Sequence, residues 1–312
     1  MSLENPMAMR ESPERGREVE IVLKFQRHGL REGNDLTPEG REITRAMAEQ
    51  SDLHVANGEF NAAKAIGSPV ATPVATTESP NPMSRALETA HITATTVAGL
   101  RSGEWNARPE ERLSYENIKS PRPYDHLKIY NEALATSIRN LGKGDLQQKD
   151  LTKEEQIKVT EEAQAVTIRH VSALDTPEAR LYKKENAGMF ADLLEHYIKM
   201  PDYLKNKSKV LYVAGTHGGT MEWLLQEALV RTDTEGNNKV GLESFDEIGG
   251  GFNSSDTYNV DIKTDKDGKL QVLRLTFDNP SRPQEEMYLD REKIKELASF
   301  YRGLHADEIS EK

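Results

Sequence analysis

Cysteine is absent from this chain of 312 residues. Its absence excludes a thiolate nucleophile, a zinc site built on cysteine pairs and a disulfide framework. No apolar run approaches the length of a membrane span. Lysine and arginine are not concentrated in any one stretch, and 41 basic against 52 acidic side chains give a formal net charge of −11. The sequence therefore lacks the basic surface that nucleic-acid binding requires.

The amino-terminal segment also lacks the apolar core of a secretory signal, so we expect a cytoplasmic protein. Its prolines, glycine and alternating charges predict a flexible leader over residues 1–17. The remaining length suits a single domain at about 18–304 and a short tail at 305–312. The sequence does not indicate an oligomeric state.

Apolar runs predict two buried strands, Glu20–Phe25 and Val210–Ala214, and β-branched residues predict a third at Val70–Thr77. A helix is expected to begin after Thr37 as N-cap and to run towards Val55. Helical spacing predicts three more helices, at Arg85–Val97, Thr220–Val230 and Arg291–Tyr301.

The region of about 124–200 has a mostly helical pattern, interrupted at 143–150, and we expect it to be an insertion over the ligand crevice. Downstream, the turn Asp267-Gly268 joins two strand-like segments, 256–263 and 269–277, into a hairpin. Alternation of strands and helices predicts a three-layer α/β/α sandwich with a mainly parallel sheet. The hairpin would add antiparallel character at one edge.

Two of the predicted strands end in a similar motif. Arg27-His28-Gly29 follows the first strand, and Thr216-His217-Gly218-Gly219 follows the strand at 210–214. Open α/β sheets place their ligands at the carboxyl ends of strands, so we expect both histidines at one crevice. Arg85 begins a predicted helix between them in the sequence.

This set of side chains suits phosphoryl transfer through a histidine. A ring nitrogen can attack phosphorus when the other nitrogen is fixed by a hydrogen bond. The planar guanidinium groups of Arg27 and Arg85 would hold phosphoryl oxygens in pairs, which a lysine point charge cannot do. His217 and backbone N–H groups at the following helix would supply further donors. The leaving oxygen would need a proton from a carboxyl group in the segment 109–116.

Together these motifs resemble the histidine phosphatase superfamily, in its phosphoglycerate mutase-like branch. The resemblance covers about residues 20–225 and also includes Leu36-Thr37 with Gly40, and Arg85-Ala86 with Thr89-Ala90. It implies that His28 is the phosphorylated nucleophile. We expect no cofactor. The resemblance also implies a phosphate pocket, for which we name Arg27, Arg85, His217, Gly218 and Asn34.

A proton donor is also implied, for which Glu116, three residues after Leu113, fits best and Glu111 is the alternative. Two departures from the family pattern matter. Leu30-Arg31-Glu32-Gly33-Asn34 replaces the continuation usual in the mutases, although Arg31 is similar to the second arginine of the acid-phosphatase branch. That branch has an aspartate where Gly218 stands.

We therefore predict a hydrolase acting on a small phosphorylated substrate. A mutase that returns the phosphoryl group to its substrate is the first alternative, and a non-catalytic module that binds a phospho-ligand is the second. No histidine pair has the spacing of a metal site on a helix, so we expect no metal. Gly249-Gly250-Gly251 lacks the register of a nucleotide-binding loop, and we expect a flexible loop there.

Overall fold

The computed structural model describes most of the chain. The described residues are 14–32, 35–51, 60–69, 83–98, 107–144, 146–232 and 236–309. Within these ranges, no helix combines the length and the apolar character needed to cross a membrane. The strand expected at Val70–Thr77 and the predicted site residue Asn34 lie outside the described residues.

Among the described residues, nine strands form one sheet in the order β5-β4-β6-β1-β9-β10-β11-β7-β8. The first four pair in parallel: β5 (Arg108–Pro109), β4 (Ala62–Gly67), β6 (Lys209–Thr216) and β1 (Glu20–Arg27). The other strands pair antiparallel: β9 (Thr257–Lys263), β10 (Leu273–Phe277), β11 (Met287–Leu289), β7 (Leu229–Thr232) and β8 (Asn238–Val240). The α/β class is confirmed, but the sheet is mixed rather than mainly parallel.

The physical reason for this difference is the position of the hairpin. β9 pairs antiparallel with the central strand β1. The hairpin therefore begins the antiparallel half of the sheet instead of lying at its edge. Its turn forms as predicted, with Gly268 at φ +79° and its N–H donating to Asp265 O at 3.0 Å. Two short strands, β2 (Arg31–Glu32) and β3 (Asp35–Leu36), form a separate ladder near the end of β1.

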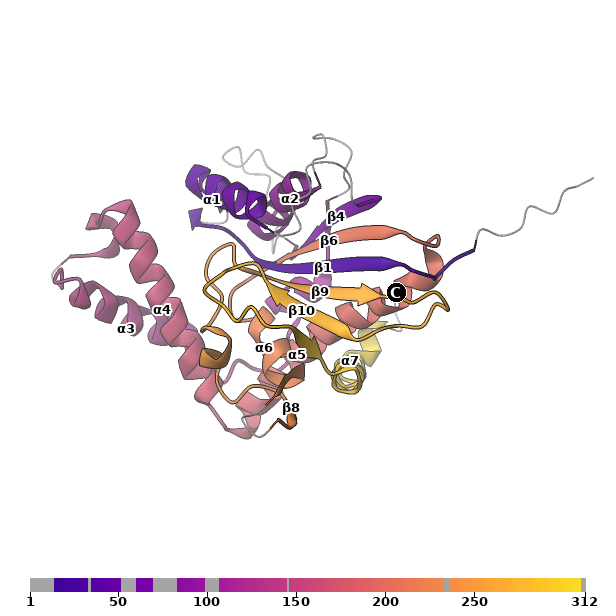
Figure 1. The fold of residues 1–312 in the computed structure, drawn as a ribbon. Coiled ribbons are helices and arrows are strands. Elements are labelled where there is room, and N and C mark those ends of the chain that lie inside the picture. Colours follow the sequence, from indigo (N-terminus) through magenta and orange to yellow (C-terminus); the bar gives the residue numbers. More distant parts are fainter. Residues whose placement is uncertain are drawn as a thin grey trace, which may run out of the picture.

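Helices cover both faces of the sheet and complete the predicted three layers (Figure 1). On one face lie α1 (Pro38–Glu49) and α2 (Arg85–Val97), and on the other lie α5 (Pro177–Lys199), α6 (Met221–Ala228) and α7 (Arg291–Leu304). Caps fix the first two helix starts: Thr37 accepts from Gly40 N at 2.9 Å, and Ser84 accepts from Leu87 N at 3.1 Å. The helix expected to run towards Val55 ends at Glu49, and the one expected at Arg85–Val97 is confirmed.

Two cores of different character hold the layers together. The larger one packs aromatic and aliphatic side chains of β1, β9 and α5, with the ring of Phe25 lying 5.4 Å from Phe190 and 5.0 Å from Tyr258. The smaller one, under α1 and α2, is built largely of alanine and valine. Small side chains let α2 approach the sheet closely: a Cβ on Gly215 would lie 1.9 Å from Ala86 O. This approach brings α2 to the end of the strand that carries His217.

The helices of the 124–200 region behave in two ways. α3 (His126–Asn140) and α4 (Lys153–Ala173) form a pair that extends away from the sandwich (Figure 1), with their own cluster of Ile138, Leu151 and Val159. By contrast, α5 packs along α7 and belongs to the main core. How much of this region is an insertion stays a prediction.

The remaining elements are short. They are the 3₁₀ helices η1 (Glu111–Leu113), η2 (Tyr115–Asn117), η3 (Gln148–Asp150), η4 (Met200–Tyr203) and η5 (Phe245–Ile248), and the helix α8 (Ala306–Ile309). Near the start of the described chain, Gly16 N donates to Leu204 O at 3.0 Å and Gly16 O accepts from Thr264 Oγ1 at 2.7 Å. Part of the expected leader is therefore hydrogen-bonded to the sandwich.

Candidate active site

His28 occupies the carboxyl end of β1 and is only 6% exposed. Its Nδ1 lies 2.8 Å from Gly29 O, and since a carbonyl only accepts, Nδ1 carries the hydrogen and Nε2 keeps its lone pair. Burial, and then the neighbouring His217 and Arg85, hold the pKa of His28 well below its ordinary 6.5. The ring is therefore neutral, with an unprotonated Nε2 available for attack.

His217 lies beside His28 because β6 and β1 are adjacent parallel strands that end together, with Arg27 opposite Thr216. The two ring centroids are 5.2 Å apart. Nδ1 of His217 lies 3.4 Å from Arg85 Nη2, which can only donate, so Nε2 carries the hydrogen and donates to Ser68 Oγ at 3.0 Å. Burial, and then the charges of Arg85 and Arg31, lower the pKa of His217 to about 3. This ring is neutral too.

Arg27 and Arg85 both reach this site, as expected. Arg27 is 2% exposed, and its Nη1 donates to Phe252 O. Burial lowers the pKa of Arg27, partly offset by the attraction of nearby carboxylates. Burial, followed by the charge of Arg31, lowers the pKa of Arg85 to about 10, so that its guanidinium remains charged at neutral pH.

Arg31 is a site neighbour that the predicted set of phosphate-binding residues did not include. It lies on β2, and its charge acts on both Arg85 and His217. The Arg-His-Gly-x-Arg spacing noted in the sequence was the available indication. The place of the side chain depends on the β2–β3 ladder, which the sequence did not reveal.

Gly218 lies against Arg27. A Cβ at this position would lie 2.7 Å from Arg27 Nε and 3.0 Å from Cζ, closer than any unstrained contact. The neighbouring Gly219 has φ +79°, and its N–H donates to Glu222 Oε2 at 3.0 Å. The glycine pair therefore leaves room for the guanidinium. A direct contact from Gly218 to phosphate stays a prediction.

Helix α2 holds the start of the crevice in place. Thr89, one turn after Arg85, accepts from Gly29 N at 3.1 Å. The same hydroxyl donates to Arg85 O at 2.8 Å. Thr89 therefore connects the backbone beside His28 to the helix that carries the second arginine.

The predicted proton donors lie in the short helices after β5. Glu116 is exposed, and within the described part of the chain its carboxylate forms no hydrogen bond or ion pair with the histidines or arginines of the site. Glu111 is also exposed, and its Oε2 accepts from Asn117 Nδ2 at 3.0 Å. The residue between them that reaches the site is Tyr115, whose ring lies edge-on 5.2 Å from that of His217. The donor role of Glu116 stays a prediction.

A further carboxyl comes from the protruding helix pair. Glu161 on α4 is half-buried, and its Oε1 accepts from Ser254 N at 3.4 Å. Ser255, the next residue, donates its N–H to His28 O at 3.4 Å. Burial raises the pKa of Glu161, with the charge of Arg27 acting in opposition. In the sequence this residue is one glutamate among many in a polar helix, so nothing distinguished it there.

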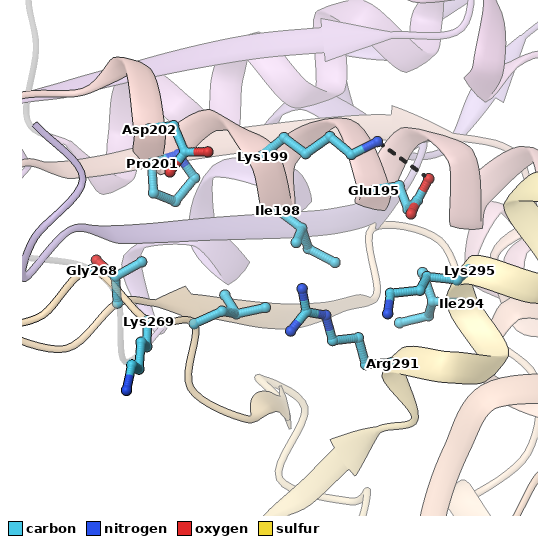
Figure 2. A pocket seen from close by; sticks show the side chains of 12 residues that line it. Glu195, Ile198, Lys199, Pro201, Asp202, Gly268, Lys269, Arg291, Ile294 and Lys295 are labelled. Carbon is cyan, nitrogen blue, oxygen red and sulfur yellow. Dashed lines mark ion pairs between the residues drawn. The ribbon is translucent and has the colours of Figure 1, made fainter.

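Across the described ranges, no three histidine or acidic side chains gather as a metal-binding group would. A separate cavity of about 420 Å³ lies between the end of α5, the start of α7 and the β9–β10 turn (Figure 2). Thr264, at the far end of β9 from His28, lines it, so it is not part of the histidine site.

Comparisons with known proteins do not identify a family for this chain. No family model matches the chain, and no curated protein matches its sequence. Among solved structures, the chain is similar to the phytase from D. castellii, with 10% sequence identity and a TM-score of 0.41 over 94% of this chain and 81% of that one.

Proposed function

We propose that the chain is a phosphomonoester hydrolase that works through a phosphohistidine on His28. The observation that carries this proposal is the site itself: a neutral histidine with an unprotonated Nε2, its ring centroid 5.2 Å from that of a second neutral histidine, beside the buried Arg27 and the half-buried Arg85. A neutral imidazole is the nucleophilic form, and guanidinium groups bind the charge spread over phosphoryl oxygens.

In the first step, His28 Nε2 forms a bond to phosphorus while the bond from phosphorus to the ester oxygen breaks. The Nδ1–H bond to Gly29 O stabilises the positive charge that develops on the ring. The departing oxygen takes a proton from a carboxyl group. In the second step, water attacks phosphorus, its proton returns to the carboxylate, and the N–P bond breaks to release inorganic phosphate.

Arg27 and Arg85 are proposed to hold the phosphoryl oxygens throughout. His217 accepts a hydrogen bond from Arg85, so it positions that guanidinium in the ligand-free protein. Its Nε2–H bonds to Ser68 Oγ and becomes a donor to a phosphoryl oxygen when that bond is exchanged. Arg31 adds positive charge at the same place.

The proton donor is proposed from two sources. Glu116, with Glu111 as its alternative, comes from the sequence pattern. Glu161 comes from its place beside the loop that bonds to His28, together with a raised pKa that favours the protonated form. The substrate is proposed to be a small phosphorylated molecule.

Trapping of the covalent intermediate tests the proposal. The protein is mixed with a ³²P-labelled phosphomonoester, quenched without acid and mapped by peptide analysis, and the label is expected on His28. His28→Ala should abolish labelling and lower kcat by about 10³-fold or more, because the covalent route is lost. His170→Ala, at an exposed position on α4, is the matched control and should retain both. Label on another residue would contradict the assignment.

The two alternatives are separated by a paired assay. Release of inorganic phosphate from a panel of phosphomonoesters supports the hydrolase. Isomerisation of phosphoglycerate, primed by bisphosphoglycerate and without net phosphate release, would support the mutase instead. Binding of phosphate with neither activity would support the non-catalytic module.

A further inference from the structure

The segment Gly249-Gly250-Gly251 leads to the carbonyl group that holds Arg27. Nη1 of Arg27 donates to Phe252 O, and within the described residues this is the one hydrogen bond of that guanidinium. The orientation of Arg27 therefore depends on where the Phe252 carbonyl lies. Gly249 and Gly250 have φ of +80° and +90°, so the loop follows a path that glycine adopts without strain. The proposed phosphoryl transfer assigns no role to this loop.

A second buried arginine, Arg282, binds the carbonyl oxygens of the same loop. Its Nη1 donates to Ile248 O at 2.7 Å and to Gly250 O at 3.0 Å. Its Nη2 donates to Gly251 O at 2.8 Å. The guanidinium carbon also lies 4.1 Å from the centre of the Phe252 ring, where cation–π attraction adds to the hydrogen bonds. One side chain therefore fixes the loop up to the residue that binds Arg27.

Glu222 binds the other side of the last peptide group in this loop. The carbonyl of Gly251 and the N–H of Phe252 belong to one planar peptide unit. That N–H donates to Glu222 Oε1 at 3.2 Å, so the unit is bound at both its carbonyl and its N–H. Glu222 Oε2 accepts from Gly219 N at 3.0 Å, next to the glycine that packs against Arg27. Glu222 thus joins the two loops that flank the guanidinium of Arg27.

Glu222 and Arg282 are buried charges, and burial of a charge is unfavourable unless hydrogen bonds compensate it. They are 0% and 2% exposed. Arg282 forms an ion pair with Asp256 at 2.9 Å, whereas Glu222 accepts its hydrogen bonds from the two loops beside Arg27. Burial lowers the pKa of Arg27, and Glu222 is the acidic group that opposes this most. The contacts of both residues therefore converge on the surroundings of Arg27.

We propose that Glu222 and Arg282 are positioning residues for Arg27. They hold the Phe252 carbonyl and the Gly218-Gly219 loop so that the guanidinium is aimed at the phosphoryl oxygens before substrate arrives. This rests on the proposed function, in which Arg27 binds the phosphoryl group. Neither side chain takes part in the chemistry, so any effect of changing it should pass through Arg27.

A double-mutant cycle on phosphate binding tests the proposal. Glu222→Gln keeps the side-chain shape, but its amide offers an acceptor to only one of the two N–H groups, so one loop bond is lost. We expect the affinity for inorganic phosphate and for vanadate, and also kcat/KM, to fall about tenfold. In an Arg27→Ala background the same change should alter phosphate affinity by less than about twofold, because no guanidinium remains to be displaced. An undiminished loss in that background would overturn the proposal.

Glu185→Gln is the matched control. Glu185 is also 0% exposed, and its two oxygens accept from Lys119 N at 2.8 Å and Ser120 N at 2.9 Å. It bonds to neither of the loops beside Arg27, so this variant should lose thermal stability but keep its phosphate affinity. An equal loss of phosphate affinity in Glu185→Gln would show that general destabilisation causes the effect, and would overturn the proposal.

Arginine resonances test the position of Arg27 directly. Arg282→Lys keeps the charge, but one ammonium group cannot reproduce the planar set of donors to three carbonyl oxygens. In protein labelled with ¹⁵N-arginine, the Nε–H signal of Arg27, identified by its loss in Arg27→Ala, should shift in Glu222→Gln and Arg282→Lys but not in Glu185→Gln. An unchanged signal in both variants would overturn the proposal. If neither variant folds, hydrogen exchange in the unsubstituted protein decides: the Gly219 and Phe252 amides should exchange slowly, and rapid exchange would overturn it.

These outcomes are separate from the test of the proposed function. Labelling of His28 decides whether a phosphohistidine forms, whereas phosphate binding and the Arg27 signal decide whether Glu222 and Arg282 position Arg27. A protein that forms no phosphohistidine but shows the expected cycle would lose the proposed function and keep the positioning role. Formation of the phosphohistidine with unchanged kcat/KM in both Glu222→Gln and Arg282→Lys would overturn the positioning role alone.

Discussion

The contact between Gly218 and Arg27 allows one prediction to be worked out from distances. In Gly218→Ala, the new methyl group would lie 2.7 Å from Nε, 3.0 Å from Cζ and 3.2 Å from Cδ of Arg27. Ordinary contacts between such atoms are about 3.5–4.0 Å, so the guanidinium must move by roughly 1 Å. Arg27 cannot move freely, because it is buried and its Nη1 donates to Phe252 O.

A displacement of about 1 Å in a group that holds the reacting phosphoryl typically costs about 10²-fold in rate. We therefore expect kcat/KM for phosphomonoester hydrolysis to fall by about 10²-fold, or about 2.7 kcal/mol in transition-state stabilisation. Inhibition by vanadate should weaken in parallel, because it uses the same guanidinium. Gly303→Ala is the matched control: no atom lies within 4 Å of its added methyl group, and its kcat/KM should be unchanged.

A double-mutant cycle identifies Arg27 as the group that is displaced. In an Arg27→Ala background the methyl group added at position 218 has no guanidinium to displace, so adding Gly218→Ala should change kcat/KM by less than about threefold. A full 10²-fold loss in that background would refute the reasoning. So would a Gly218→Ala protein with normal thermal stability and normal kcat/KM.

Three further predictions follow from the site. Arg85→Lys keeps the charge but loses the planar pair of donors, and should cost about 2–4 kcal/mol in kcat/KM, with weaker inhibition by phosphate as the check. The pKa of His217 is about 3 in the folded protein and 6.5 ordinarily, so folding favours the neutral ring. The stability that the neutral His217 contributes is therefore complete above pH 6.5 and is lost as the pH falls towards 3. Urea unfolding of His217→Asn should accordingly show a weaker loss of stability between pH 6.5 and 4, and an equal loss would contradict the lowered pKa. If Glu161 is the proton donor, Glu161→Gln should slow the hydrolysis of alkyl phosphates far more than that of aryl phosphates, because a phenolate leaves without a proton. The same selective loss in Glu116→Gln instead would assign the proton-donor role to Glu116.

The sequence was sufficient to predict that the two histidines meet. Both follow strongly apolar strands, and parallel neighbours in an α/β sheet bring their carboxyl ends together, as β1 and β6 do. Arg85 could be placed because the helical spacing of residues 85–97 sets the helix start at this arginine, as α2 confirms. These predictions depend on local patterns, which sequence records directly.

Pairing between distant segments could not be predicted in the same way. β4 has the sequence AAKAIG, whose alanines suit a helix better than a strand, and only its position beside β6 makes it a strand. Similarly, the helix expected at Thr220–Val230 ends at Ala228, because Leu229–Thr232 forms a strand that pairs with β11 and β8. Glu161 reaches the site through such tertiary placement, and no spacing rule indicated it. For Arg31 the Arg-His-Gly-x-Arg spacing was an indication, but its position depends on the β2–β3 pairing.

The two predicted arginines differ in a way that suggests how the ligand is bound. Arg27 has Glu222 and Asp256 nearby, whose attraction partly offsets the effect of burial on its guanidinium before any substrate arrives. Burial lowers the pKa of Arg85 most, and the like charge of Arg31 lowers it further, so Arg31 adds an unfavourable electrostatic energy to the ligand-free protein. A phosphoryl dianion bound between Arg85 and Arg31 would replace the repulsion between their guanidinium groups by attraction to the ligand. A protein of net charge −11 would attract an anionic substrate in this way, because binding relieves the repulsion between these two guanidinium groups.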